Sequence, residues 1–257
     1  MTNEKIEVNA GTNTTACVLL IGNEILSGKT QDANLQYLGT ELSRLGVRLA
    51  EARVVPDDED VIVATVNECR ARYTYVFTTG GIGPTHDDIT AQCIATAFGR
   101  ELILDERAVE CLKRGSFELN EARLKMARLP EGSALIENPK SNAPGFRVEN
   151  VYVLAGIPSI ARAMFETIAE EFDRGPPIYS RNVDVFMREG DIAGPLEVIA
   201  EEFPYIEIGS YPFARDGRFG ANLVVRGTDA EQLDVALKKI VETMTELGDD
   251  SSVGEPS

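Results

Sequence analysis

A glycine-rich segment, TTGGIGPTHDDIT at residues 78–90, combines residue types that bind phosphate. Its glycines let the backbone approach an anion closely and turn N–H groups toward it. A helix predicted to start near Asp88 adds the partial positive charge of its N-terminus. The candidate ligand-binding residues of this segment are Gly80, Gly81, Gly83, Thr85 and Thr90. The alternative is a structural turn in which Asp87 or Asp88 caps the helix.

Two adjacent carboxylates, Asp87 and Asp88, lie beside this phosphate site, where a bound anion would be repelled. A divalent cation resolves the conflict, because Mg²⁺ is commonly held by one or two carboxylates together with substrate phosphates. Asp57 is a third candidate ligand, and the metal would polarise a phosphoryl oxygen or activate water. Alternatively, one aspartate accepts a hydrogen bond from a ligand hydroxyl or amino group and no metal binds. His86 is either a general acid or base near the metal or a solvent-facing loop residue.

Three further polar turns, at residues 22–34, 141–146 and 155–159, accompany the glycine-rich segment. The candidate ligand-binding residues in them are Gly22, Glu24, Ser27, Asp32, Asn142, Gly145, Gly156, Pro158 and Ser159. Lys29 is a possible point charge for a phosphate. Taken singly, these residue types are also ordinary at helix starts. Together they predict a crevice at the carboxyl ends of the strands of an open sheet.

Apolar runs that end at glycine or proline predict the strands that position these turns. The predicted strands are residues 16–22, 47–55, 74–79 and 151–156, with helices marked by Leu35 to Leu45, Ile62 to Cys69 and Ile94 to Phe98 between them. This alternation predicts an α/β domain with a parallel sheet and helices on both faces. The rest is a helical stretch at 105–127 with a possible break at Gly115, short strands at 133–137 and 145–149, and an amphipathic helix at 159–173.

A composition break at Gly175-Pro176-Pro177 predicts a linker between two domains. The second domain reads as strand 179–187, helix 194–203, strands 205–210 and 219–226, and helix 229–247. We therefore expect domains at 15–175 and 177–248, with flexible termini at 1–14 and 249–257. The second is a small α+β domain with the order β-α-β-β-α.

The 257 residues carry a formal net charge of -17, which argues against unspecific binding to nucleic acid or to an anionic membrane. Four scattered cysteines indicate buried thiols in a reducing compartment. The polar N-terminus lacks the apolar stretch of a signal peptide, and no run is long enough to span a membrane. We expect a cytoplasmic protein without membrane or nucleic-acid partners.

Several of these segments together resemble a known family. They are VLLIGNEILSGKTQDAN, VPDDED, TTGGIGPTHDDIT, NPKSNAPGF and AGIPS. The chain is similar over residues 16 to 173 to the MoaB/MogA molybdenum-cofactor domain, and most to its CinA branch (competence/damage-inducible protein A, N-terminal part). SYPF at 210–213 and the small α+β unit resemble the KH-like domain that follows in that branch. Residues 177–257 contain seven Lys and Arg against sixteen Asp and Glu. The net charge of this domain is therefore negative, whereas binding to a nucleic-acid backbone requires a positive surface.

The resemblance implies a three-layer molybdopterin-binding fold that assembles as a dimer or trimer. MogA-like members adenylylate molybdopterin with Mg²⁺ and ATP, and their central pair of aspartates matches Asp57 and Asp88. CinA-like members are similar to hydrolases of ADP-ribose-like nucleotides, and the related domain of some FAD synthases points the same way. Asp87 replaces the arginine that the family loop often carries, and Ser159 replaces an acidic residue after the proline. The amidase domain of full-length CinA proteins is not expected here.

Three hypotheses follow. The first is a protein of the molybdopterin-binding family that binds a phosphorylated pterin or an adenine nucleotide in the glycine-rich loop. The second is a pyrophosphatase acting on ADP-ribose, FAD or a similar dinucleotide, with Mg²⁺ or another divalent cation on Asp57, Asp87 and Asp88. The third is a non-catalytic oligomeric or regulatory module that kept the fold.

Overall fold

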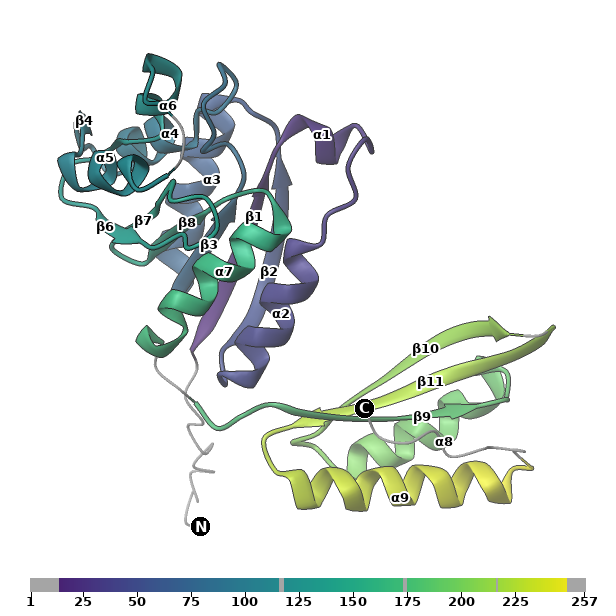
Figure 1. Ribbon diagram of the computed structural model, residues 1–257. Coiled ribbons are helices and arrows are strands. Elements are labelled where there is room, and N and C mark those ends of the chain that lie inside the picture. The colour runs from purple at the N-terminus through teal and green to yellow at the C-terminus, as the bar shows by residue number, and fades with distance from the viewer. Residues whose placement is uncertain (1–13, 116–117, 173–174, 216, 249–257) are drawn as a thin grey trace, which may run out of the picture. The chain divides into compact units, whose positions relative to one another are not determined.

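The chain divides into two compact units, Met1–Gly175 and Pro176–Ser257, which are described separately (Figure 1). The computed structural model describes residues 14–115, 118–172, 175–215 and 217–248. The termini predicted to be flexible, Thr14 apart, lie outside the described residues. No described helix combines the length and the apolar character needed to cross a bilayer.

A six-stranded sheet forms the centre of the first unit, in the order β2-β1-β3-β8-β7-β6. Its strands are β1 (Thr15–Ile21), β2 (Arg48–Val55), β3 (Tyr75–Thr79), β6 (Ala134–Ile136), β7 (Gly145–Val148) and β8 (Val151–Leu154). The strands β2, β1, β3 and β8 are parallel, as predicted. β7 runs antiparallel to β8, and β6 antiparallel to β7, so the sheet is mixed rather than wholly parallel. The reason is the short link after β7, because two residues cannot form a crossover.

Helices cover both faces of this sheet (Figure 1). They are α2 (Asn34–Arg44) and α7 (Pro158–Ile168) on one face, and α3 (Glu59–Arg72), α4 (Thr90–Ala97) and α5 (Glu106–Lys113) on the other. Leu38, Leu42 and Phe165 pack against Phe77 on the first face. On the second face lie Ile62, Val66, Ile94 and Ala108, with the free thiols of Cys17, Cys69 and Cys93 buried among them. The predicted three layers are present.

The helical stretch predicted over 105–127 is divided near the possible break at Gly115. The structure has α5, then a separate short helix α6 (Glu121–Lys125), and then β5 (Arg128–Pro130), which pairs antiparallel with β4 (Leu102–Leu104). The new helix starts because the Asn120 side chain accepts a hydrogen bond from the backbone N–H of Arg123. A four-residue helix α1 (Asn23–Leu26) follows β1, and a turn η1 (Ala169–Glu171) follows α7.

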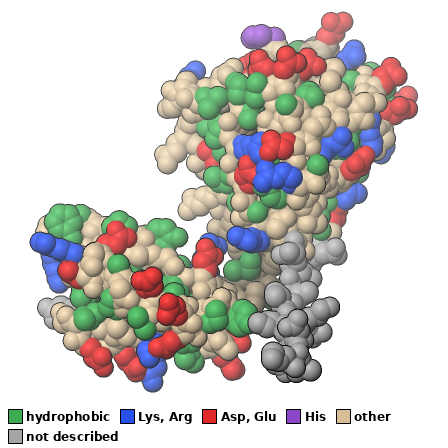
Figure 2. All heavy atoms as spheres, turned by 180° about the vertical axis from the view of Figure 1, so that it is seen from behind, with side chains coloured by type: hydrophobic (Ala, Val, Ile, Leu, Met, Phe, Trp, Pro, Cys, Tyr) green, Lys and Arg blue, Asp and Glu red, His purple; other side chains and the backbone are tan. Residues whose placement is uncertain are grey.

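The second unit has the predicted order β-α-β-β-α. Its elements are β9 (Tyr179–Val185), α8 (Glu189–Glu202), β10 (Glu207–Arg215), β11 (Arg218–Gly227) and α9 (Ala230–Glu246). The sheet order is β10-β11-β9, all antiparallel, and both helices pack on one core. α8 begins at Glu189 instead of residue 194, because burial of Ile192 in that core extends the helix ahead of Pro195. On the face shown in Figure 2, acidic side chains are scattered over both units.

Candidate functional site

The parallel register brings four strand ends together at one edge of the sheet. Ile21 pairs with Val55, Leu20 with Thr79, and Thr79 with Leu154. The segments that follow these strands therefore begin side by side, as expected for the ligand edge of an open α/β sheet. We call residues 80–89 the glycine loop. Residues 22–33 form the first loop.

A pocket of about 650 Å³, here called the main pocket, lies among these segments. The predicted residues that line it are Glu24, Gly80, Gly81, Gly83, Asp88, Gly156 and Pro158. Thr30, Asn138 and Ser141 add polar groups, and Ile82, Leu112, Met126 and Met164 add apolar surface. Three of the four predicted turns therefore contribute predicted residues to one cavity, and the turn at 141–146 contributes Ser141 and Ala143 beside them.

The conformation of the glycine loop depends on its first two glycines. Gly80 has φ 101° and Gly81 has φ 67°. A Cβ on Gly80 would lie 2.2 Å from the Ile21 carbonyl oxygen, and a Cβ on Gly81 would lie 2.2 Å from Thr90 Oγ1. The buried Thr90 hydroxyl donates to the Gly80 carbonyl at 2.9 Å, and the Thr90 N–H donates to the Gly81 carbonyl at 3.0 Å. The loop is thus folded back onto the start of α4.

This folding leaves backbone donors available along the pocket wall. Among the described residues, no protein acceptor pairs with the N–H groups of Gly81, Ile82 or Gly83. All three residues line the main pocket. Successive unpaired N–H groups next to a helix start form a concave anion site. The glycine loop can therefore bind phosphate oxygens through its backbone.

Thr85 organises the acidic end of the glycine loop. Asp88 Oδ2 accepts hydrogen bonds from the Thr85 N–H at 2.8 Å and from the Thr85 hydroxyl, which also lies 2.6 Å from Asp87 Oδ1. The Thr85 hydroxyl lowers the pKa of Asp87, assisted by the N–H of Asp87 itself and by the charges of His86 and Lys125. Lys125 Nζ donates to the Thr85 carbonyl. Asp88 faces the pockets, whereas the side chains of Asp87 and His86 are exposed to solvent.

The predicted metal set is not gathered at one point. Asp57 Oδ2 accepts a hydrogen bond from the Asn23 N–H at 2.9 Å, which ties the turn after β2 to α1. Asp57 is not among the described residues that line the main pocket, whereas Asp88 is. No group of three or more His, Cys, Asp or Glu side chains could hold a metal ion within the part of the chain that the structure describes. The protein can therefore offer Asp88 as a ligand but not a complete metal site.

Other predicted residues have local structural contacts. Asp32 accepts hydrogen bonds from the N–H groups of Asn34 and Leu35 at the start of α2, and the Ser27 hydroxyl donates to the Glu24 carbonyl at 3.2 Å. Both belong to the first loop, whose Lys29 is exposed. Gly22 is buried and its N–H donates to the Val55 carbonyl at 3.1 Å. These contacts support the helix-start interpretation of this loop, apart from Glu24.

The turn at 141–146 is organised by Asn138. Its side chain donates to Ser141 Oγ and the Ala143 carbonyl, and accepts from the N–H groups of Lys140 and Ser141. Asn142 adopts φ 60° beside the pocket lining, and Gly145 is buried in β7, where a Cβ would lie 2.4 Å from the Val153 carbonyl oxygen. Asn142 and Gly145 thus shape the turn, while Asn138 and Ser141 face the pocket.

Ser159 lies in the first turn of α7 and is exposed. The residues that line the main pocket near this helix are Ala155, Gly156, Ile157, Pro158, Ile160 and Met164. The helix start at the pocket is therefore formed by neighbours of Ser159.

The basic residues of the site come from α6, which the sequence analysis did not single out. Arg123 lines the main pocket, and Lys125 lies beside the glycine loop. These two side chains supply positive charge near the glycine loop, in which Asp87 replaces the arginine that the family often carries. In the sequence, these residues could have been found as two basic side chains on a short helix that starts after Asn120.

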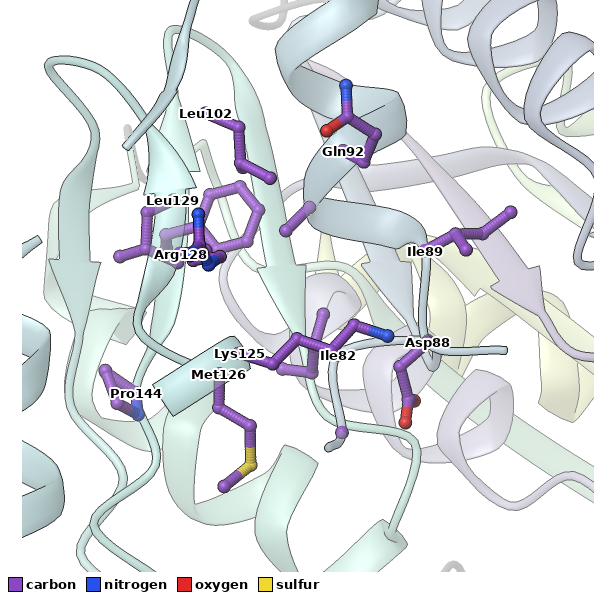
Figure 3. A pocket seen from close by; sticks show the side chains of 14 residues that line it. Ile82, Asp88, Ile89, Gln92, Leu102, Lys125, Met126, Arg128, Leu129 and Pro144 are labelled. Atoms are coloured by element: carbon purple, nitrogen blue, oxygen red, sulfur yellow. The ribbon is translucent and has the colours of Figure 1, made fainter. Parts of the chain in front are cut away.

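A second pocket of about 170 Å³ lies on another side of the glycine loop (Figure 3). It is lined by Gly81, Ile82, Gly83, Asp88, Ile89, Ala91, Gln92, Leu102, Lys125, Met126, Arg128, Leu129, Pro144 and Phe146. The Lys125 side chain extends across it toward Asp88 (Figure 3). Five residues are common to both pockets: Gly81, Ile82, Gly83, Asp88 and Met126. The glycine loop is therefore the wall between two cavities.

Comparisons with known proteins agree with this architecture. Residues 17–174 match the family model of a probable molybdopterin binding domain, and residues 177–248 match that of the FAD synthase middle domain. A curated Archaeoglobus fulgidus protein is 35% identical over 89% of this chain and 97% of its own length. A CinA-like protein of Kosmotoga olearia is 31% identical over 83% of this chain, which spans 54% of that relative. The solved structure of Thermoplasma acidophilum CinA, described as having unknown function, is 33% identical with a TM-score of 0.58, over 62% of this chain and 98% of that one.

Proposed function

The chain belongs to the family of probable molybdopterin binding domains, and we propose that it binds a small phosphorylated ligand, either a phosphorylated pterin or an adenine nucleotide. The unpaired N–H groups of Gly81, Ile82 and Gly83 are the observation that carries this proposal. Hydrogen bonds from backbone N–H groups to an ionised phosphate are stronger than those to neutral acceptors. The phosphate lies over the glycine loop.

The main pocket supplies space for the heterocycle attached to that phosphate. Its volume of about 650 Å³ is in the usual range for small-molecule sites. Its apolar side chains suit a flat ring, while Asn138 and Ser141 offer polar groups for the ring edge. Arg123 adds the positive charge that a phosphorylated ligand requires in a protein of net charge -17.

Titration calorimetry with molybdopterin and with ADP tests this proposal. Loss of one charged hydrogen-bond donor typically costs about 1.5–3 kcal/mol. We therefore expect Arg123→Gln to weaken binding roughly tenfold or more. Arg114→Gln is the matched control, because Arg114 is exposed at the end of α5 and does not line the pocket among the described residues. Absence of binding by either ligand at millimolar concentration contradicts the proposal.

A second candidate function, hydrolysis of a dinucleotide diphosphate, is favoured by the position of Asp88. This carboxylate lines both pockets at the wall between them, where a diphosphate joining two groups would pass. In this reaction a water oxygen bonds to one phosphorus, and the bridging oxygen leaves with the other phosphate. The proton released by that water passes to bulk solvent, and Asp88 takes part as the ligand of a cation.

A divalent cation would enter this site together with the phosphates. Asp88 is the residue that would hold it, since Oδ1 is not used in the contacts with Thr85. When bound, the cation would polarise a phosphoryl oxygen. Lys125 keeps the Asp88 segment in place by its hydrogen bond to the Thr85 carbonyl.

The test is an assay of ADP-ribose, FAD and NADH cleavage with and without Mg²⁺. We expect Asp88→Asn to reduce metal-dependent cleavage about 100-fold or more. Asp87→Asn changes the same charge on the exposed side of the loop and is expected to have a much smaller effect. Equal losses in the two variants, or full activity in Asp88→Asn, would remove Asp88 from the reaction. If folded protein binds nucleotide without cleaving it, hydrolysis is rejected and only the binding function remains.

A further inference from the structure

The sheet of the second unit ends at β10, a strand that has a neighbour on one side only. The strand order is β10-β11-β9, and no described strand pairs with the outer side of β10 (Figure 1). An edge strand presents a row of backbone N–H and C=O groups, to which an extended peptide can bind as an added strand. β10 is nine residues long and therefore offers several such groups.

Pro212 shows which backbone groups of β10 face outward. A proline has no N–H, so in a strand that pairs with β11 along its whole length the proline nitrogen points to the free side. Because successive residues of a strand alternate in direction, the N–H and C=O groups of Ile208 and Ser210 point to the same free side. Their side chains face the helices, since Ile208 packs against the core of this unit. Pro212 also ends the row of donors.

A cavity of about 400 Å³, here called the edge pocket, lies between α8 and this part of β10. Its floor is formed by Ile192 and Leu196, which are buried in the core, and the small side chains of Ala193 and Ala200 leave space beside the strand. The Ser210 hydroxyl is buried at the pocket and has no hydrogen-bond partner among the described residues. Pockets beside an edge strand receive alternate side chains of the strand that is added.

The charge of the edge pocket indicates its occupant. Two carboxylates line it, Glu189 and Glu197, and no Lys or Arg of the described residues does so. Neither carboxylate has an ion-pair partner within the described chain, whereas Glu202 of the same helix pairs with Lys239 at 3.3 Å. A Lys or Arg side chain would lay its aliphatic stem on Ala193 and bring its charge to the two carboxylates.

The same charges decide between a foreign segment and a second copy of this chain. The second unit has a net negative charge, which attracts a basic segment. Two copies joined edge to edge would bring the unpaired Glu189 and Glu197 of each copy toward those of the other, and like charges repel. The edge therefore favours a basic partner over self-association.

We infer that β10 and the edge pocket form a docking site for an extended basic segment of another protein. The segment adds as an antiparallel strand to the outer side of β10, like the other strand pairs of this sheet. Its backbone bonds to Ile208 and Ser210, and the residues opposite these two point their side chains to the same face. Those positions carry Lys or Arg into the edge pocket. Pro212 limits the length of the paired stretch.

Fluorescence anisotropy with the full chain and a labelled hexapeptide tests the site. The probe is amidated Lys-Thr-Lys-Thr-Lys-Thr, and two further versions carry N-methyl groups on the backbone nitrogens of either the Lys or the Thr residues. All versions have the same side chains and charge. We expect the Lys-methylated probe to bind at least about tenfold more weakly than the unmodified one, because it cannot donate to Ile208 and Ser210. The Thr-methylated probe should bind within about twofold of the unmodified one.

Variants of the protein test the same site. Glu197→Lys should weaken binding of the unmodified probe at least about tenfold. Glu246→Lys makes the same charge change at an exposed position at the end of α9, outside the described lining of the pocket, and should alter binding less than about twofold. Ser210→Pro removes an outward N–H and should weaken binding, whereas Ser210→Ala keeps this N–H and should retain most of it. Circular dichroism verifies that each variant is folded.

Three results would overturn the docking site. Equal affinity for the two methylated probes, or equal losses in Glu197→Lys and Glu246→Lys, would show that binding follows net charge alone. Absence of binding of the unmodified probe at millimolar concentration would leave the edge without this occupant. Self-association in sedimentation analysis that Ser210→Pro abolishes and the probe does not displace would assign the edge to a second copy. The proposed binding of a phosphorylated ligand by the first unit does not depend on these results.

Discussion

The loops after β1 and after β3 begin at neighbouring strands of the sheet, and both combine glycine with acidic side chains. In the glycine loop, main-chain contacts to Thr90 and side-chain contacts around Thr85 hold the backbone against α4. In the first loop, Asp32 caps α2, Ser27 bonds to the Glu24 carbonyl and Lys29 is exposed. Similar composition thus serves two purposes. The glycine loop presents backbone N–H groups to the main pocket, whereas the first loop contributes Glu24 and Thr30 to its wall and also starts two helices.

The difference lies in what surrounds each glycine. Gly81 and Gly28 have nearly the same backbone angle, φ 67° and φ 70°. A Cβ on Gly81 would meet Thr90 Oγ1 at 2.2 Å, whereas nothing lies within 4 Å of a Cβ on Gly28. Conformation is therefore matched between the two positions, and only the packing differs. Substitution at these two sites separates the two contributions.

Gly81→Ala is expected to have the largest effect. Positive φ costs a non-glycine residue about 1–2 kcal/mol, and displacement of Thr90 adds to it, for a total of about 3 kcal/mol or more. Gly28→Ala incurs only the backbone term and should cost about 1 kcal/mol. Urea unfolding of both variants measures the two free energies. Equal costs would show that the glycine loop is no more constrained by packing than the first loop.

The contrast also explains what the sequence could predict. Apolar runs ending at glycine located the parallel strands, because burial on both faces of a sheet leaves a continuous hydrophobic signal. The strand ends then placed Gly80, Gly81, Asp88 and Gly156 at one edge, where the structure also has them. These residues follow their strands closely in the sequence, so the local sequence is enough to predict where they lie.

Other parts of the site depend on packing between distant segments. Lys125 of α6 contacts Thr85 of the glycine loop from 40 residues further along the chain, and Arg123 of the same helix lines the main pocket. No periodicity or motif links them to Thr85. The sequence predicted no element for the β4–β5 pair, which walls the second pocket and lies outside the helical stretch at 105–127, because strands of three residues are too short for an alternation signal. Long-range contacts of this kind need the tertiary structure.

Asp32 tests whether the first loop contributes to stability or to ligand binding. Asp32→Ala removes the side chain that accepts from the Asn34 and Leu35 N–H groups, so it should cost about 1 kcal/mol of stability. Affinity for a ligand in the main pocket should remain within about twofold, because Asp32 does not line that pocket among the described residues. Chemical unfolding and calorimetry give the two values. Asp32→Ser keeps a capping oxygen and should restore most of the stability. A large loss of affinity with unchanged stability would make the first loop a binding loop.

The smallest expected effect concerns the Thr85 hydroxyl. Thr85→Val removes the donor that most strongly lowers the pKa of Asp87, so this pKa should rise toward its ordinary value. Thr85→Ser retains the hydroxyl and should leave the pKa low. Carbon-detected NMR titration of the Asp87 carboxyl measures both. An unchanged pKa in Thr85→Val would assign the shift to the Asp87 N–H or to the charges of His86 and Lys125.

The sign of the accompanying stability change follows from linkage. A carboxyl whose pKa is lower in the folded state stabilises the protein fully above its unfolded pKa of about 3.9. That contribution disappears as the pH falls through the lower, folded pKa. The stability difference between wild type and Thr85→Val that arises from Asp87 should therefore be present at neutral pH and shrink in the acid range below about pH 4. Because Asp87 is exposed, solvent keeps this difference small, and a difference that persists unchanged in acid would not arise from the Asp87 carboxylate.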